Sequence, residues 1–219
     1  MKSVIFDMDG VIVDSQLHWM KVQSGFLASL VDGWTEQDQQ RIIGMSMTDV
    51  HRLLVEDYGA TVTLAEMVKY YEGLAEKIYL EESSIFEGCR DLIAELKGRG
   101  VQLAVASASP KPWILMTVKR FELEQFFISL VSSDDVGAKG KPAPDIYLHA
   151  AASIDADAEN CIAIEDSKKG VASAQAAGMK CFGFLNGYNK KRDVELADFL
   201  IEGFGEKERA EVLSMALEG

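Results

Sequence analysis

The sequence is short of cysteine, of long apolar runs and of positive charge. Its three cysteines, Cys89, Cys161 and Cys181, are odd in number and none shares CxxC spacing with another, so we expect reduced thiols. Cys161 and Cys181 lie within apolar runs and are expected to pack in the core. No apolar stretch approaches the length of a membrane span, and the first residues show no secretory signal. The sequence therefore predicts a cytoplasmic protein with no membrane partner.

Lysine and arginine number 22, against 35 aspartates and glutamates, which gives a formal net charge of −13. This excess argues against a broad surface for nucleic acid or for an anionic membrane. An anionic substrate would need a local positive site, made by a metal ion, a lysine or backbone amides. With 219 residues, 48% of them hydrophobic, the chain can form one large domain or two small ones around an ample core.

Two carboxylates follow the first apolar segment. Val4–Phe6 has the β-branched and aromatic composition of a strand buried on both faces. Asp7 and Asp9 come next, and alternate side chains of an extended backbone share a face, so both could lie over the carboxyl end of this strand. Open α/β sheets bind their ligands at that end. The alternative is a surface turn, which Asp and Gly favour, but carboxylates beside an apolar strand need partners or a cation.

The following residues, 15–83, have the pattern of helices and contain no convincing strand. Thr35–Asp38 and Thr63–Glu66 have the spacing of capping boxes, so each predicts the start of a helix. Gly44–Asp49 is expected to be a loop. The pattern predicts a helical domain inserted between the first strand and the rest of the chain.

After residue 83, apolar strands alternate with amphipathic helices. This alternation implies right-handed crossovers and a parallel sheet. We therefore predict an α/β fold with a doubly wound parallel sheet, formed by residues 1–14 and 84–219. The further strands are expected at 101–106, 128–132, 161–164, 180–184 and 198–201, and the helices at 88–98, 111–121, 145–153, 171–177 and 206–217.

Polar residues follow several of the predicted strands. Ser107 follows the second strand, and Glu165 and Asp166 follow the fourth. A parallel sheet would bring all three to the edge that carries Asp7 and Asp9. Several carboxylates do not gather without cations, and oxygen ligands with a phosphate substrate favour Mg²⁺.

Lys141, positioned by Pro142 and Pro144, could add a fixed positive charge to this edge. Such a set can bind and transfer a phosphoryl group, with a carboxylate attacking phosphorus and with the metal, the lysine, a serine hydroxyl and loop amides holding its oxygens. Structural interpretations also exist. An isolated lysine is usually solvated, and Ser107 or Ser109 could merely cap the next helix. Asp134 and Asp135 are expected in a solvated turn.

Four segments, in order along essentially the whole chain, resemble the motifs of the haloacid dehalogenase superfamily: Asp7–Gly10, Ser107, Gly140–Asp145 and Glu165–Ser167. The sequence looks most like the β-phosphoglucomutase-like phosphatases of that superfamily. The resemblance implies a Rossmann-like, haloacid-dehalogenase-like core with an inserted α-helical cap domain, here residues 15–83.

The resemblance also implies roles for the residues of these motifs. Asp7 would be the nucleophile that forms an aspartyl-phosphate, and Asp9 the general acid and then the general base. The phosphoryl group would be bound by Ser107, Ala108 and Lys141. The Mg²⁺ ion would be held by Asp7, the backbone carbonyl of Asp9, Asp166 and, directly or through water, Glu165. Substrate contacts from the cap are expected among His18, Trp19, Gly44, Met45, Ser46, Met47, Lys69 and Lys77.

The dehalogenases of the superfamily lack the second aspartate, so Asp9 favours phosphoryl chemistry. We therefore expect a monomeric, Mg²⁺-dependent phosphatase that hydrolyses a small phosphorylated metabolite, a sugar or polyol phosphate. In the resembling mutases an arginine follows the Gly-x-Ser loop of the cap and grips a second phosphate, whereas here Met47 follows it. A thioether cannot make that contact, although Lys69 or Lys77 could compensate, so a phosphomutase is the alternative.

A second alternative is a non-enzymatic phospho-accepting switch similar to a receiver domain. Receivers have no cap, so the helical insert argues against this class. One further departure from the subfamily is Glu87-Gly88, where Pro-Gly is common. It lies at the linker that returns from the insert.

Overall fold

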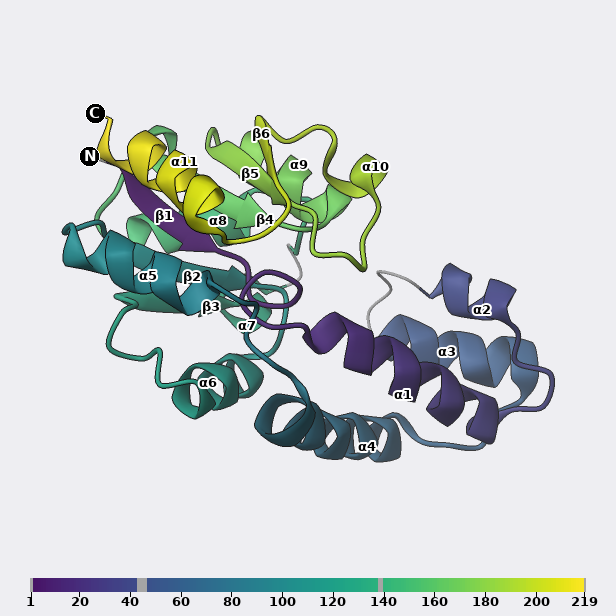
Figure 1. Ribbon diagram of the computed structural model, residues 1–219. Helices are drawn as coiled ribbons and strands as arrows, with labels where there is room; N and C mark the ends of the chain where they lie inside the picture. Colours follow the sequence, from purple (N-terminus) through teal and green to yellow (C-terminus); the bar gives the residue numbers. More distant parts are fainter. Residues whose placement is uncertain (1, 43–46, 138–139, 219) are drawn as a thin grey trace. The chain divides into compact units, whose positions relative to one another are not determined.

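The computed structural model describes residues 2–42, 47–137 and 140–218, and the chain divides into two compact units (Figure 1). The first unit, Met1–Ser15 with Ser83–Gly219, is called the core unit below. The second, Gln16–Glu82, is called the helical unit. The insert expected from the sequence, 15–83, differs from the helical unit by one residue at each end.

The core unit contains a six-stranded parallel sheet with the order β3-β2-β1-β4-β5-β6. β1 lies at the centre and pairs with both β2 and β4. Strands β2 and β3 are added on one side of β1, and β4, β5 and β6 on the other, so the strand order reverses beside β1. The predicted doubly wound parallel sheet, with a Rossmann-like strand order, is confirmed. The strands are β1 (Ser3–Phe6), β2 (Leu103–Ser107), β3 (Ser129–Ser132), β4 (Cys161–Glu165), β5 (Lys180–Phe184) and β6 (Phe199–Ile201).

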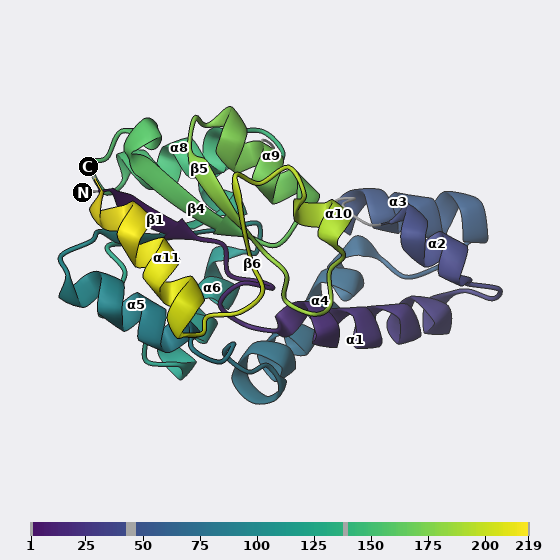
Figure 2. The ribbon, with the colours of Figure 1, turned by 45° about the horizontal axis from the view of Figure 1, so that its top comes forward.

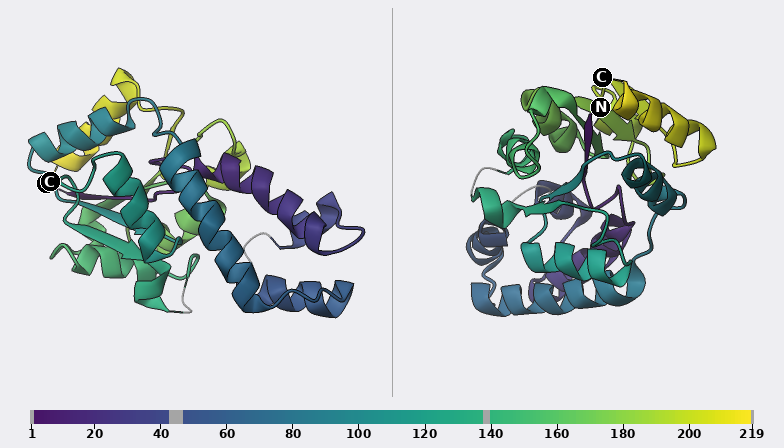
Figure 3. Two further views of the ribbon diagram at one scale, coloured as in Figure 1. Left: turned by 90° about the horizontal axis from the view of Figure 1, so that it is seen from below. Right: turned by 90° about the vertical axis from the view of Figure 1, so that its left-hand side faces the viewer.

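The central strands are apolar along their whole length because helices cover both faces of the sheet. Every residue of β1, β2 and β4 is buried. Helices α5 (Cys89–Gly98) and α11 (Glu206–Leu217) pack side by side on one face, where Arg209 Nε donates to Glu95 Oε1 at 3.0 Å (Figures 2 and 3). Helices α8 (Asp145–Ala152) and α9 (Lys168–Ala176) cover the other face (Figure 3).

All three cysteines are free and buried, so the core packing expected for Cys161 and Cys181 is confirmed and Cys89 shares it. The structure explains why position 88, in the Glu87-Gly88 pair, is a glycine. Its φ is +77°, and a Cβ there would lie 2.1 Å from the carbonyl oxygen of Phe204. Only glycine fits this position at the start of α5.

The segment after β3 corrects one sequence-based expectation. Asp134 and Asp135 are exposed, as expected, but they lie in a short helix, α7 (Ser133–Val136), and not in a turn. Asp134 Oδ2 accepts from the backbone N–H of Lys111 at 2.8 Å, and Asp135 Oδ2 accepts from the Ser132 N–H at 2.8 Å. Asp135 also pairs with the Lys111 ammonium at 2.6 Å. Partners outside the segment therefore stabilise the helical turn. The remaining helices of the core unit are α6 (Lys111–Arg120), the 3-10 helix η2 (Ala158–Asn160) and α10 (Lys191–Val194).

The described part of the helical unit consists of helices and connecting loops and contains no strand, as expected. It comprises α1 (Ser15–Leu30, which begins in the core unit), α2 (Glu36–Arg41), α3 (Met47–Tyr58), α4 (Leu64–Lys77) and a π-helical turn, η1 (Ile78–Glu82). The capping box predicted at the start of α4 is present: the Thr63 hydroxyl accepts from the Glu66 N–H, and Glu66 Oε2 accepts from the Thr63 N–H at 2.9 Å. The aromatic and aliphatic side chains between these helices form a core of their own.

The prediction of a loop at Gly44–Asp49 is partly wrong. Residues 44–46 lie outside the described residues, but Met47–Asp49 form the first turn of α3. Asp49 suits that position, because a carboxylate in the first turn interacts favourably with the helix dipole. Across the described residues, no helix is both long enough and apolar enough to span a membrane.

Candidate active site

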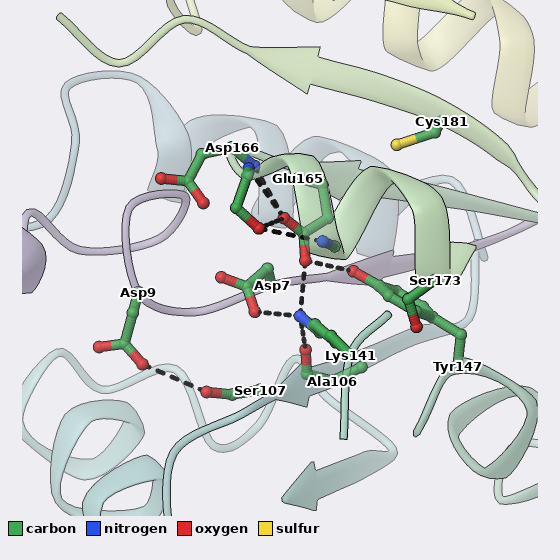
Figure 4. A network of polar contacts seen from close by, with 12 residues as sticks. Asp7, Asp9, Ala106, Ser107, Lys141, Tyr147, Glu165, Asp166, Ser173 and Cys181 are labelled. Carbon is green, nitrogen blue, oxygen red and sulfur yellow. Dashed lines mark hydrogen bonds and ion pairs between the residues drawn. The ribbon is translucent and has the colours of Figure 1, made fainter. Parts of the chain in front are cut away.

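Three neighbouring strands of the core unit end at one edge of the sheet, and each brings a polar residue there. Asp7 follows β1, Ser107 is the last residue of β2, and Glu165 is the last residue of β4. Phe6 pairs with Ile164, and the Asp7 N–H donates to the Ile164 carbonyl at 3.0 Å, so these strand ends are level. Figure 4 shows the side chains gathered at this edge.

Lys141 lies at the centre of the gathered residues. Its ammonium is 2.6 Å from Asp7 Oδ1, 2.6 Å from Glu165 Oε1 and 3.0 Å from the carbonyl oxygen of Ala106 (Figure 4). These three acceptors match the three N–H donors of a lysine. The side chain is only 7% exposed, so it is not the solvated lysine of the alternative interpretation. The two adjacent carboxylates raise the pKa of Lys141, which keeps it charged.

Glu165 is held on both carboxylate oxygens. Oε1 accepts from Lys141 and from the hydroxyl of Tyr147 at 3.0 Å. Oε2 accepts from the backbone N–H of Asp166 at 3.0 Å and from the N–H and the hydroxyl of Ser167, each at 3.1 Å. Five donors thus fix the orientation of one buried carboxylate, which cannot turn without losing several of them.

Asp7, Glu165 and Asp166 each offer a carboxylate oxygen within 4.8 Å of the others, and all three residues are buried. Burial and the neighbouring Glu165 raise the pKa of Asp7 to about 8, although Lys141 acts in the opposite direction. Burial and Glu165 also raise the pKa of Asp166 well above its ordinary value. The positive charge of one lysine therefore does not balance the negative charge of three carboxylates. The cluster suits a divalent cation that prefers hard oxygen ligands.

Asp9 has its own set of partners, which are serine hydroxyls. Ser15 Oγ donates to Asp9 Oδ1 at 2.5 Å, and Ser109 Oγ and Ser107 Oγ donate to Oδ2 at 2.6 and 3.2 Å. The two aspartates of the first motif therefore have different environments: Asp7 pairs with an ammonium, and Asp9 accepts from neutral hydroxyls. Groups with different environments can take different roles in one reaction.

The segment after β2 was predicted to bind phosphate or, alternatively, to cap the next helix. The residue at the N-cap of α6 is Pro110, which makes no side-chain cap. The hydroxyls of Ser107 and Ser109 go to Asp9 instead, and Ser107 Oγ accepts from the Ser109 N–H at 3.1 Å. Ala108 is exposed between the two serines. The helix-cap interpretation of the serines is therefore not supported.

Several substrate-contact candidates of the helical unit are engaged within that unit. Trp19 Nε1 donates to the Tyr79 hydroxyl at 3.1 Å. His18 Nδ1 lies 3.3 Å from Glu82 Oε2, and the Lys77 ammonium lies 3.0 Å from Glu82 Oε1. Lys69 is exposed, and Met47, the first residue of α3, packs against the apolar core of the unit. Gly44, Met45 and Ser46 lie outside the described residues. A substrate contact by any of the eight stays a prediction.

Among the residues that the sequence interpretation missed are Tyr147, Ser15, Asn186 and Asn189, whose side chains contact the site. Tyr147 had a detectable signal, because it lies six residues after Lys141 in the predicted helix 145–153, where a buried phenol needs a polar partner. Asn186, which donates to Asp166, follows β5 in a polar loop whose composition indicates only a turn.

Fold and site together define an α/β enzyme whose acidic residues meet where the strand order of a parallel sheet reverses. The sequence model of the haloacid dehalogenase-like hydrolase family matches residues 4–184, and the chain belongs to this family. The family membership predicted from the sequence, and with it the prediction of a hydrolase, is confirmed.

Individual relatives agree with this assignment. The phosphorylated carbohydrates phosphatase of Thermotoga maritima is 29% identical over 190 residues, which cover 86% of this chain and 88% of that protein. The β-phosphoglucomutase of Bacillus subtilis is 31% identical over 199 residues, or 85% and 84% of the two chains. Among solved structures, that of CbbY from Rhodobacter sphaeroides in complex with phosphate is similar with a TM-score of 0.79 and 26% identity, covering 94% of this chain and 96% of that one.

Proposed function

We propose that this protein is a Mg²⁺-dependent phosphatase that hydrolyses a small sugar or polyol phosphate through an aspartyl-phosphate on Asp7. One observation carries the proposal: the Lys141 ammonium is buried 2.6 Å from both Asp7 and Glu165, whereas Asp9 accepts hydrogen bonds from the hydroxyls of Ser15 and Ser109. A two-step phosphoryl transfer requires a nucleophile beside a fixed cation and a second carboxylate that exchanges protons. The phosphatase of Thermotoga maritima, named for phosphorylated carbohydrates, supports the substrate class.

The donor set of the core unit fits Mg²⁺. Its buried carboxylate oxygens lie within 4.8 Å of one another. Burial and the neighbouring carboxylates raise the pKa of Asp7, and a divalent cation would offset their negative charge. We assign the ion to Asp7, Asp166 and the backbone carbonyl of Asp9, with Glu165 binding directly or through water. Mg²⁺ held there would neutralise charge on the phosphoryl oxygens.

In the first half of the reaction, a carboxylate oxygen of Asp7 bonds to phosphorus while the bond from phosphorus to the ester oxygen breaks. Asp9 gives its proton to the departing oxygen, which leaves as an alcohol. Lys141 keeps the Asp7 carboxylate in place and sets a positive charge beside the phosphoryl group.

In the second half, Asp9 takes a proton from a water molecule as the water oxygen bonds to phosphorus. The bond from phosphorus to Asp7 breaks, which releases inorganic phosphate and the free carboxylate. The hydroxyl donors around Asp9 hold its carboxylate in one position for both halves of the reaction. The helical unit is proposed as the cap domain that selects a small substrate and excludes water.

Transfer between two hydroxyls of one sugar is the second candidate, because one relative is a β-phosphoglucomutase. Met47 argues against it, because an uncharged thioether at the start of α3 cannot hold a second phosphate as a guanidinium would. A non-enzymatic phospho-accepting switch is not supported, because the chain belongs to a hydrolase family.

To test the proposal, the protein is incubated with Mg²⁺ and each of a set of sugar and polyol phosphates, and the release of inorganic phosphate is measured. Asp7→Asn should abolish release, because an amide oxygen cannot form the acyl-phosphate. Asp155→Asn is the matched control: Asp155 is exposed with φ +53°, a conformation that Asn tolerates, so this variant should keep full activity.

Turnover by folded Asp7→Asn would contradict the assignment of the nucleophile. A reaction with β-glucose 1-phosphate, Mg²⁺ and catalytic bisphosphate separates the two candidate functions. Release of inorganic phosphate supports the phosphatase, whereas accumulation of glucose 6-phosphate with little free phosphate supports the mutase.

A further inference from the structure

An asparagine after β5 joins two loops of the site. Asn186 Nδ2 donates to Asp166 Oδ2 at 3.0 Å and to the backbone carbonyl of Gly10 at 2.9 Å. Asp166 belongs to the loop after β4, and Gly10 to the turn after β1 that also carries Asp9. A single amide nitrogen therefore sets the distance between these two loops, whose residues are more than 150 positions apart in the chain.

Asn186 is itself held by a second asparagine. Its Oδ1 accepts from the N–H groups of Tyr188 and Asn189, each at 3.0 Å, and its own N–H donates to Asn189 Oδ1 at 3.1 Å. Asn189 Nδ2 donates in turn to the backbone carbonyls of Asp166 at 2.7 Å and Phe184 at 2.8 Å. Both donors and both acceptor lone pairs of the Asn186 amide are thus used, so its orientation is fixed.

This hydrogen-bonded loop lies beside a cavity. The loop borders a cavity of about 980 Å³ within the core unit, which is lined also by Phe86 and Phe204. Gly187 has φ +85° and Tyr188 is 46% exposed. The polar contacts of Asn186 and Asn189 therefore fix a loop that lies at the edge of this cavity.

We propose that Asn186 is a positioning residue of the metal site, which orients the Asp166 carboxylate and fixes its distance from the turn at Gly10. The proposal rests on the proposed function, in which Asp166 is a Mg²⁺ ligand. A carboxylate whose second oxygen is tied to an amide cannot rotate freely, so it presents its ligand oxygen in one direction. Loss of such an outer contact typically weakens metal affinity by about 10- to 100-fold.

The variant that tests this role is Asn186→Ser. A serine hydroxyl can still accept from the N–H groups of the turn, as Ser does in ST-turns, but it is too short to reach Asp166. Asn186→Ala serves the same comparison should Asn186→Ser fail to fold. Tyr188→Ala is the matched control, because it changes the exposed side chain of the same loop and leaves the asparagine contacts intact.

The measurement is a titration with Mn²⁺, in which electron paramagnetic resonance counts the free ion. We expect one site in the wild-type protein, a loss of binding in Asp166→Ala, and a dissociation constant raised about 10- to 100-fold in Asn186→Ser. If Asn186 only kept the protein folded, Asn186→Ser would reduce the fraction of molecules that bind Mn²⁺. The molecules that still bind it would do so with the wild-type dissociation constant. Phosphatase activity of Asn186→Ser should accordingly recover at high Mg²⁺, with a raised half-saturating concentration and a kcat near that of the wild type.

Binding of Mn²⁺ by Asn186→Ser within twofold of the wild type would overturn the positioning role and leave the proposed function intact. An equal loss of affinity in Tyr188→Ala would also overturn it, because the effect would then belong to the loop as a whole. Failure of the wild-type protein to bind Mn²⁺, or unchanged binding by Asp166→Ala, would refute the metal site of the proposed function and this inference with it.

Discussion

Gly170, in the first turn of α9, is the position where one added methyl group should do most damage to the site. A Cβ there would lie 1.8 Å from Glu165 Oε1, 1.9 Å from Cδ and 2.1 Å from Oε2. Since Cβ atoms do not approach other heavy atoms closer than 3.0 Å, the carboxylate must move by at least about 1.2 Å to reach that distance from 1.8 Å.

Glu165 cannot make this movement without losing its partners. Its Oε1 accepts from Lys141 and Tyr147, and its Oε2 accepts from two backbone N–H groups of its own loop. Displacement would break the contact of Glu165 with Lys141, which is one of the three that hold the ammonium beside Asp7. We expect Gly170→Ala to lower kcat/KM by about 100-fold, the effect of a misplacement near 1 Å, and to destabilise the fold by about 1–3 kcal/mol, as overpacking does.

Gly98→Ala is the matched control. Gly98 is also helical, in α5, but a Cβ there meets nothing within 4 Å. This substitution should leave activity unchanged and stabilise the helix by up to about 1 kcal/mol. Phosphate release and urea unfolding of both variants are the assays. If Gly170→Ala kept wild-type stability and activity within twofold, the rigidity assigned to Glu165 would be refuted.

Three further predictions concern charge, metal and thiols. Lys141→Met should abolish activity and destabilise the metal-free protein by about 3–5 kcal/mol in urea unfolding, because it leaves buried carboxylates without their cation; a loss below 1 kcal/mol would contradict this. Rigorous chelation with EDTA should stop phosphate release and added Mg²⁺ restore it, so full activity after chelation would exclude the metal site. Burial raises the pKa of the Cys161 thiol to about 11 and those of Cys89 and Cys181 as well. A higher pKa leaves less thiolate at pH 8, so a thiol reagent should label all three quickly only after unfolding; fast labelling of the native protein would show that the thiols are accessible.

Local patterns in the sequence were sufficient for most of the regular elements. Strand 180–184 and helix 206–217 have the bounds predicted for them, because a buried apolar run and a 3.6-residue period are properties of a few neighbouring residues. The capping box of Thr63 and Glu66 is local for the same reason. By contrast, α7 was expected as a turn, since its stabilising partner Lys111 lies on another element.

The sequence also determined which edge of the sheet holds the candidate site, because parallel strands that end in polar residues must bring them together. It could not determine which side chains pair there. Lys141 contacts Asp7 and Glu165, which are 134 and 24 positions away, and Asn186 contacts Gly10, 176 positions away. Such contacts depend on strand order, register and the angle at which each helix packs, and no short segment encodes these. The acidic residues of the site could therefore be identified from the sequence, whereas only the tertiary structure determines which side chains they contact.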